Sequence, residues 1–419
     1  MRFDLRFAAV LLAGTLLGGW FADMEAQGIN IPPPAHWVAT WATSVQGAEP
    51  QNGQPALDPA RLTDATIRQI VHLSVGGTSL RVVFSNAFGT QPLLMDAASV
   101  ALPVGTSAAI QPGSDHPLTF AGRSSVTIPV GASFVSDPVT LAPLPLSNLT
   151  ITFHLPAAPE GQTAHPGSRE TSFLVHGNHV SDPDLPGAEK IVRWFQIAEV
   201  DVTGPAQNAV VALGDSITDG HGATTDGNDR WPDILAAHLR AGGITDTGVV
   251  NEGIGGNHLL TNGLGENVLE RFDRDVLSPA EGRYVIVLEG INDLGALART
   301  PNATPEQHTE LVHRMEAAYL QIIERAHAHG MRVYGATITP DGGSGYYHPN
   351  ADDEAARQAV NAWIRQPGHF DGFVDFDQIA RDPAHPDRLL PAFDSGDHLH
   401  PGPAGYKAMG NAVPLAWFR

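Results

Sequence analysis

Two hydrophobic patterns divide the chain near residue 205. From about His36 to Val202, short runs rich in β-branched and apolar residues are separated by Pro, Gly, Asp and Ser, and no helical period of comparable strength appears. Beyond the loop "TGPAQN", continuous apolar runs alternate with helical segments. The pattern predicts a β-rich domain over residues 36–202 and an α/β domain over residues 208–419.

The clearest strand unit of the first region is "ATIRQIVHLSVGGTSLRVVFSN", where Gly76 and Gly77 join two runs. Because glycine adopts the positive φ angles of tight turns, we expect these runs to form a hairpin. The runs "SVTIPV", "DPVTL" and "NLTITFHL" predict further strands. Short strands with turn signals every ten residues or so predict an antiparallel β-sandwich of two packed sheets.

The second region reads as alternating buried strands and helices. The best helix begins with Thr304 as its cap, Pro305 in its first turn and Gln307 completing a capping box, and it ends at Gly330. Parallel strands need right-handed helical crossovers, so we expect a three-layer α/β/α domain. The predicted strands are residues 209–214, 248–253, 284–290, 331–338 and 372–376, and the other helices are residues 232–243 and 352–364.

The N-terminus has the pattern of a secretory signal. Arg2 and Arg6 precede an apolar segment from about Phe7 to Phe21, and small residues follow near Ala22 to Ala26. The apolar run is shorter than the roughly 20 residues that a spanning helix needs, so we expect cleavage rather than a membrane anchor. Residues 1–26 are therefore predicted to be a signal peptide, and the mature protein is predicted to be secreted or periplasmic.

Charge and composition narrow the classes of partner. The chain of 419 residues is 42% hydrophobic and 16% charged, as in globular proteins, and its formal net charge of -21 disfavours nucleic acid and anionic membranes. With no cysteine, the chain forms no disulfide and has no thiolate nucleophile. We expect a neutral or weakly charged small molecule or glycan as substrate.

Candidate chemistry follows the predicted strands, at the edge where open parallel sheets bind ligands. The segments there are "GDSITDG", "NEGIGGN", "EGIND" and, near the C-terminus, "DSGDHLHPGPAGY". Ser216 in the first segment is either a helix N-cap or a nucleophile. Asp397 and His400 favour the nucleophile, because a serine hydroxyl needs an imidazole base and a carboxylate that orients it.

An attacked ester also needs donors for its oxyanion. The backbone N–H of Ser216, the backbone N–H of Gly256 and the side-chain amide of Asn292 are the candidates, although Gly256 and Asn292 could also serve only in turns. Serine, glycine, asparagine and Asp-x-x-His all arrive at strand ends in serial order, which a purely structural role does not explain.

These four blocks resemble those of the SGNH hydrolases, the GDSL esterase family, over about Asn208 to Arg419. The resemblance implies a flavodoxin-like domain, Ser216 as nucleophile, His400 and Asp397 as its partners, and an oxyanion hole of Ser216, Gly256 and Asn292. Ile217 stands where the name-giving tetrapeptide has leucine. "HWVATWATS" and "SNAFG" resemble the β-rich, jelly-roll-like domain of a secreted two-domain branch that is often associated with the removal of carbohydrate esters.

The sequence analysis thus predicts a secreted serine carboxylic-ester hydrolase that removes short acetyl-type groups without a cofactor or metal. A broad short-chain lipase or arylesterase, and a catalytically silent carbohydrate-binding protein, are the alternatives. Trp231, Tyr346, Tyr347 and His398 are candidates for lining the substrate pocket, and packing is an equal alternative for the aromatic residues. The spacing of His398 and His400 is a poor metal signature, and "DGND" at residues 226–229 is expected to be a turn.

Overall fold

The computed structural model describes residues 35–47 and 57–419, of which residues 36–419 form one compact unit. The predicted signal peptide lies outside the described residues. Within them, no helix combines the length and the apolar character needed to cross a bilayer.

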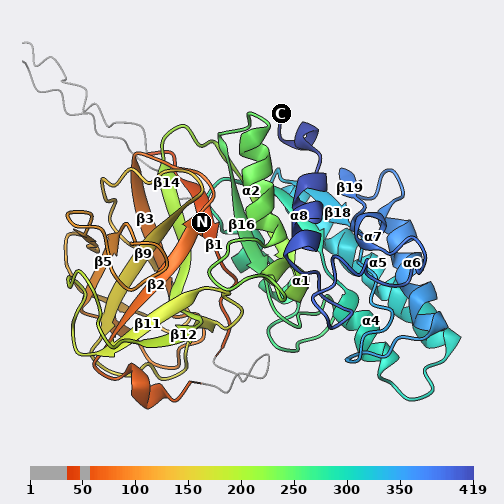
Figure 1. Ribbon diagram of the computed structural model, residues 1–419, viewed down its shortest axis with the longest axis horizontal. Coiled ribbons are helices and arrows are strands. Elements are labelled where there is room, and N and C mark those ends of the chain that lie inside the picture. Colours follow the sequence, from red (N-terminus) through yellow and green to blue (C-terminus); the bar gives the residue numbers. More distant parts are fainter. Residues whose placement is uncertain (1–34, 48–56) are drawn as a thin grey trace, which may run out of the picture. The chain divides into compact units, whose positions relative to one another are not determined.

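The β-rich region contains two larger antiparallel sheets (Figure 1). Phe84 of one sheet and Phe153 of the other meet edge to face with ring centroids 5.8 Å apart, inside the core between the sheets. The predicted two-sheet arrangement is therefore present, while the jelly-roll topology stays a prediction. In spatial order, one sheet consists of β1 (Val38–Ala42), β14 (Ile197–Thr203), β3 (Ser79–Ser85) and β8 (Ser133–Val135). The other consists of β12 (Glu189–Val192), β11 (Thr171–His176), β2 (Ala65–Leu73), β9 (Ser147–Leu155), β5 (Ala97–Ala101) and β6 (His116–Pro117).

Shorter elements complete the described part of this region. The pairs are β4 (Leu93–Met95) with β7 (Val126–Ile128) and β10 (Ala164–His165) with β13 (Trp194–Phe195), and a 3-10 turn spans Pro59–Leu62. The runs "SVTIPV" and "NLTITFHL" contain strands as predicted. The run "DPVTL" does not, because its pairing is limited to a single bridge from Val139 to Leu80.

The predicted hairpin is wrong. β2 and β3 are strands as expected, but β2 pairs with β9 and β11 whereas β3 pairs with β14 and β8, so the chain crosses from one sheet to the other between them. Gly76 and Gly77 are absent from the residues with positive φ. They serve close approach instead: a Cβ on Gly77 would lie 2.6 Å from the carbonyl oxygen of Thr203, and one on Gly76 would lie 2.5 Å from that of Pro143.

The second region has the predicted parallel sheet. Its spatial order is β16 (Thr247–Gly253), β15 (Asn208–Gly214), β17 (Gly282–Leu288), β18 (Arg332–Ala336) and β19 (Gly372–Val374). Numbered from β15, this is the 2-1-3-4-5 order of flavodoxin-like folds. The register brings Gly214, Gly253 and Leu288 to the same edge of the sheet. The segments that follow these strands therefore emerge side by side.

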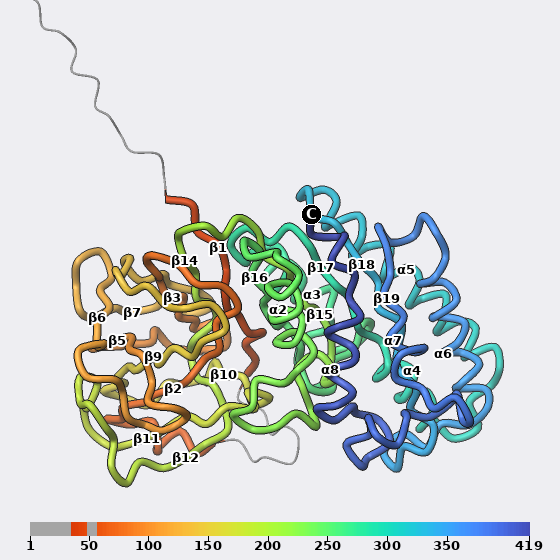
Figure 2. Tube along the Cα trace, turned by 45° about the horizontal axis from the view of Figure 1, so that its top comes forward, coloured from red at the N-terminus to blue at the C-terminus, as the bar shows by residue number. Residues whose placement is uncertain are grey.

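Helices form two groups around this sheet (Figures 1 and 2). α2 packs with α8 and α8 with α7, while α5 packs with α3 and α6. Because the strand order reverses after β16, right-handed crossovers put α2 and α3 on opposite faces, which gives the predicted three layers. The helices are α1 (Ser216–Asp219), α2 (Trp231–Ala241), α3 (Val268–Phe272), α4 (Ile291–Ala298), α5 (Pro305–Ala328), α6 (Ala351–Ile364), α7 (Phe376–Ala380) and α8 (Pro403–Ala412), with a π-helical turn at Asp273–Leu277 and a 3-10 turn at Leu415–Phe418.

Sequence signals place the ends of the long helices correctly. The Thr304–Gln307 capping box begins α5, and Gly330 has a φ of 73° just beyond its end. Pro232 lies in the first turn of α2, which ends at Gly242. The capping box of α6, which the sequence analysis did not identify, is made by Asn350 and Asp353.

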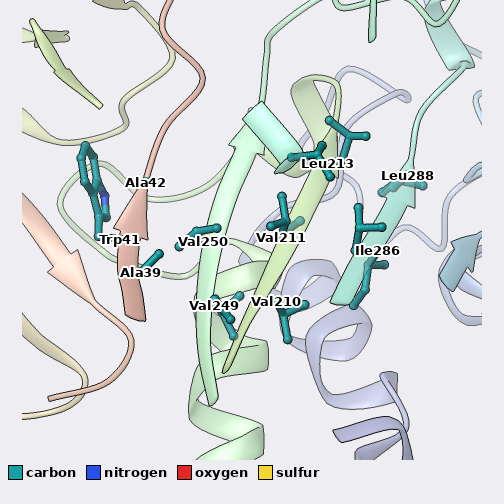
Figure 3. Packing of buried hydrophobic residues seen from close by; sticks show 14 of the residues in the cluster. Ala39, Trp41, Ala42, Val210, Val211, Leu213, Val249, Val250, Ile286 and Leu288 are labelled. Atoms are coloured by element: carbon teal, nitrogen blue, oxygen red, sulfur yellow. The ribbon is translucent and has the colours of Figure 1, made fainter. Parts of the chain in front are cut away.

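One hydrophobic core joins the two regions. β1 pairs with β14 on one side, and Thr43 just beyond it bridges to Asn251 of β16 on the other. Figure 3 shows Ala39 and Trp41 of β1 beside Val250 of β16, and all three belong to the same buried cluster. The β-rich region is therefore packed directly against an edge strand of the parallel sheet.

Candidate active site

Ser216 lies at the turn from β15 into α1, and Asp215 rather than Ser216 is the N-cap of that helix. The Asp215 carboxylate accepts a 2.8 Å hydrogen bond from the backbone N–H of Ile217. Burial raises the pKa of Asp215 to about 7, against the effect of that hydrogen bond. Because Asp215 satisfies the helix terminus, the hydroxyl of Ser216 is left for other chemistry.

His400 and Asp397 lie on the loop before α8, in line with Ser216. The Oγ of Ser216 is 2.7 Å from Nε2 of His400, and Nδ1 of His400 is 2.6 Å from Oδ2 of Asp397. The other carboxylate oxygen accepts from the backbone N–H groups of Leu399 and His400. Burial opposes ionisation of Asp397, but these bonds and the charge of His400 hold its pKa well below the ordinary value.

A second histidine stands beside this chain of hydrogen bonds. The rings of His221 and His400 have centroids 4.1 Å apart, and Nε2 of His221 lies 3.7 Å from Oδ2 of Asp397. Arg169 places Nη2 3.1 Å from Nδ1 of His221, and a guanidinium only donates, so that nitrogen must be an acceptor. Burial, with the charges of His400 and Arg169, lowers the pKa of His221 to about 4. His221 is therefore neutral near pH 7, with its proton on the nitrogen that faces Asp397.

Three of these groups also form a potential metal-ligand set. The ligand atoms of His221, Asp397 and His400 lie within 4.8 Å of one another. Two ligands about 2.1 Å from a tetrahedral ion would lie roughly 3.4 Å apart, so the 2.6 Å bond between Asp397 and His400 would have to open to admit one.

The predicted oxyanion residues follow β16 and β17. Gly256 has a φ of 70° in the turn after β16. Asn292, in the first turn of α4, donates a 2.6 Å hydrogen bond from Nδ2 to the carbonyl oxygen of Asn257, the residue after Gly256. Asp293 accepts from the backbone N–H groups of Leu259 and Leu260. The start of α4 is thus attached to the turn that contains Gly256.

The model of the GDSL-like lipase/acylhydrolase family matches residues 212–408, which span all four of these segments. Residues 212–408 form a GDSL-like lipase/acylhydrolase domain. A domain of this family implies ester hydrolase activity.

Solved structures that resemble the chain cover about half of it. A putative acylhydrolase from Bacteroides fragilis NCTC 9343 is 22% identical, with 51% of this chain and 88% of that chain covered and a TM-score of 0.37. A putative arylesterase from Agrobacterium tumefaciens str. C58 is 20% identical, with 51% and 100% covered and a TM-score of 0.37. An acetyl xylan esterase, AlAXEase, is 20% identical, with 50% and 98% covered and a TM-score of 0.36. No curated protein matches the chain significantly.

Arg271 is a central residue of the GDSL-like domain that the sequence analysis missed. Its buried guanidinium donates to the carbonyl oxygens of Gly214 and Glu252, at the ends of β15 and β16, and to the side chain of Asn257. It also donates to Ser44 of the β-rich region. Arg271 therefore fixes the spacing of the strand ends that carry Ser216 and Gly256. An arginine in a short amphipathic segment gives no sequence signal for this role.

A loop of the β-rich region makes hydrogen bonds with the segment that follows Ser216. His165 is buried, with Nδ1 2.8 Å from the carbonyl oxygen of Ser44 and Nε2 2.9 Å from Oδ1 of Asp219 in α1. Thr171 donates to Asp226 through both its N–H and its hydroxyl. We call residues 165–171, from the last residue of β10 to the first residue of β11, the clamp loop. A backbone hydrogen bond from Gly227 to Thr224 closes a turn that includes Asp226, whereas Asn228 and Asp229 lie beyond it. The clamp loop binds the carboxylate of Asp226.

The four candidate pocket residues have different positions. Trp231 is 0% exposed and donates to Thr218, so it lies in the core. His398 is bound to Asp394 of its own loop. Tyr346 is 61% exposed, and the guanidinium of Arg299 lies 5.1 Å from its ring centroid. Tyr347 is buried and donates a 2.5 Å hydrogen bond from its hydroxyl to Oδ1 of Asn292.

Proposed function

We propose that the protein is a serine carboxylic-ester hydrolase that acts through an acyl-enzyme. The observation that carries the proposal is the line of hydrogen bonds from Ser216 through His400 to Asp397, with distances of 2.7 and 2.6 Å. A catalytically silent carbohydrate-binding protein would have no need to retain this geometry. The intact line of hydrogen bonds between Ser216, His400 and Asp397 therefore favours an active enzyme.

In the proposed mechanism, Nε2 of His400 takes the hydroxyl proton of Ser216 as Oγ attacks the ester carbonyl. The Asp397 carboxylate accepts from the Nδ1–H of His400 and stabilises the imidazolium that forms. The N–H groups of Ser216 and Gly256 and the amide of Asn292 stabilise the oxyanion. Collapse of the tetrahedral intermediate expels the alcohol, which takes the proton from His400. Water then hydrolyses the acyl-enzyme by the same route and restores Ser216.

For the substrate, we propose a short acyl ester, such as an acetyl ester, of a carbohydrate or another small alcohol. Support comes from the net charge, which disfavours polyanions, and from the resemblance of the β-rich region noted in the sequence. We also propose export of the protein, supported by the signal pattern of residues 1–26. N-terminal sequencing of the exported protein would locate the cleavage site, and retention of residues 1–26 would contradict cleavage.

The test of the proposed function is turnover of p-nitrophenyl esters of graded chain length. Ser216→Ala and His400→Ala are each expected to lower kcat by roughly 10^4-fold or more, and the double variant little further, because the two residues act as a unit. His329→Ala, at the exposed end of α5, is the matched control and should retain full activity. Near-normal kcat in either single variant would remove that residue from the mechanism.

A further inference from the structure

We propose that Tyr347 is a positioning residue of the oxyanion hole, because its hydroxyl fixes the orientation of the Asn292 side-chain amide. This inference rests on the proposed function for the role of Asn292. Tyr347 lies on the loop between β18 and α6, far in sequence from the four segments of the site, and the sequence analysis considered it only as a pocket-lining or packing residue.

The hydrogen bonds assign the Asn292 amide without ambiguity. A backbone carbonyl oxygen only accepts, so the end of the amide that lies 2.6 Å from the carbonyl oxygen of Asn257 must be the NH2 group. The other end is then Oδ1, and it accepts from the hydroxyl of Tyr347 at 2.5 Å. These two contacts use one of the two N–H bonds of the amide and leave the second for a substrate oxyanion.

Packing holds Tyr347 in place for this contact. The side chain is buried, and its ring lies against the backbone of α4 at Gly295, where a Cβ would come within 2.4 Å of three ring atoms. Gly295 lies three residues after Asn292, so the glycine and the asparagine share one side of the helix. Burial raises the pKa of Tyr347, which keeps the phenol protonated and able to donate.

The contact acts on catalysis in two ways. Without the hydroxyl, Oδ1 of the buried Asn292 loses its partner, and the amide is held by Asn257 alone. A hydrogen bond at the carbonyl end also polarises the amide and strengthens its N–H as a donor. Both effects are larger in the transition state, where the oxyanion carries charge, than in the bound ester. Loss of the hydroxyl should therefore lower kcat and leave KM nearly unchanged.

The experiment compares Tyr347→Phe with Tyr334→Phe. Tyr334 is also buried, and its hydroxyl donates to the backbone carbonyl of Trp417, remote from the site, so both variants remove one hydroxyl from a packed ring. We expect Tyr347→Phe to lower kcat about 3- to 10-fold, the range of one neutral hydrogen bond, with KM within about 2-fold. Tyr334→Phe should leave both constants unchanged. An unchanged kcat in Tyr347→Phe would overturn the proposal.

The same substitution in an Asn292→Ala background separates positioning from general packing. If Tyr347 acts through Asn292, adding Tyr347→Phe to Asn292→Ala should change kcat by less than about 2-fold. An equal loss of kcat in both backgrounds would show that Tyr347 acts by another route, and would contradict the proposal.

A second measurement, by NMR, does not depend on turnover and so distinguishes this inference from the proposed function. In protein labelled with 15N-asparagine, the side-chain NH2 signals of Asn292 are identified by their disappearance in Asn292→Ala. These signals should shift in Tyr347→Phe and stay in place in Tyr334→Phe. If the wild-type protein hydrolysed no ester but the signals shifted, the proposed function would fail and the contact would stand. Unshifted signals would refute the contact itself.

Discussion

The two regions of the protein differ in how far apart in sequence their paired strands lie. In the α/β region, β15 pairs with β16 and β17, the next two strands along the chain. In the β-rich region, β1 pairs with β14, and β2 pairs with β9 and β11. A strand–helix–strand unit specifies its own neighbours through right-handed crossovers, whereas an antiparallel sandwich depends on contacts between distant segments.

The regions also differ in what they bring to the site. Ser216, Gly256, Asn292 and His400 all come from the α/β region. The β-rich region supplies the clamp loop, whose residues touch α1, His221 and the turn at Asp226 but not the Oγ of Ser216. The α/β region therefore supplies the groups proposed to react, and the β-rich region holds the segments that follow Ser216 in place. The following variants test this division.

The largest effect is expected at His165 of the clamp loop. Both its ring nitrogens face acceptors, Ser44 O and Asp219 Oδ1, and both side chains of the His165–Asp219 pair are buried. Removing one partner of such a buried pair costs roughly 3 to 5 kcal/mol. We expect His165→Ala to lower the free energy of unfolding by that amount, measured by urea denaturation, and to lower kcat as well.

His154→Ala is the matched control. His154 is also buried between two acceptors, Asp64 and Asp96, but it lies in β9, away from the clamp loop. The His154→Ala variant should have a lower free energy of unfolding than wild type, but the molecules that are folded should keep the wild-type kcat. Equal loss of kcat in both variants would show that activity follows overall stability rather than the clamp loop.

The next effect tests the chemistry of the α/β region. Asn292→Ala is expected to lower kcat about 10^2- to 10^3-fold, as for other single oxyanion donors. It should also lower the free energy of unfolding, because the carbonyl oxygen of Asn257 and the hydroxyl of Tyr347 each lose a buried partner. Asn361→Ala offers a comparison, because Asn361 is also buried and its amide bonds to the backbone of Ile338. That variant should lose stability more than kcat. An unchanged kcat in Asn292→Ala would exclude Asn292 from the oxyanion hole.

A smaller effect concerns the buried Glu170 of the clamp loop. Burial raises its pKa to about 8, with Asp226 adding to the rise and Arg230 opposing it. The folded protein therefore binds more protons than the unfolded chain between about pH 4.5 and 8, and stability from this residue falls as pH rises. Relative to wild type, Glu170→Gln should gain about 2 kcal/mol between pH 6 and 8 in urea denaturation.

Glu160→Gln, an exposed change in the same region, should show no such pH trend. A difference between Glu170→Gln and wild type that stays constant from pH 6 to 8 would mean that Glu170 does not titrate in this range.

The smallest effect is expected at Arg169. Its guanidinium donates to His221, which lies against the ring of His400, and the link is one hydrogen bond between side chains. Arg169→Gln should lower kcat about 2- to 10-fold with little change in stability. Arg123→Gln, at an exposed turn of the same region, is the comparison and should be neutral. If Arg169→Gln retained full activity, the clamp loop would contribute to stability only and not to kcat.

The sequence and the structure agree best where signals are local. A few adjacent residues are enough to indicate the capping box of α5 and the apolar runs of β15, β16 and β17. All of these elements are present as predicted. The hairpin prediction failed because Gly76 and Gly77 look the same whether they provide a positive φ or a close approach. The difference lies in Pro143 and Thr203, which the local sequence does not reveal.

The sequence by itself determined the parallel α/β region and the residues at its strand ends, because crossover rules bring those ends together. The tertiary structure decided that Asp215 caps α1 and so frees the hydroxyl of Ser216. It also decided that Arg271, the clamp loop and Tyr347 support the site. Their roles depend on hydrogen bonds between segments far apart in the chain, and such contacts follow from packing rather than from any local pattern.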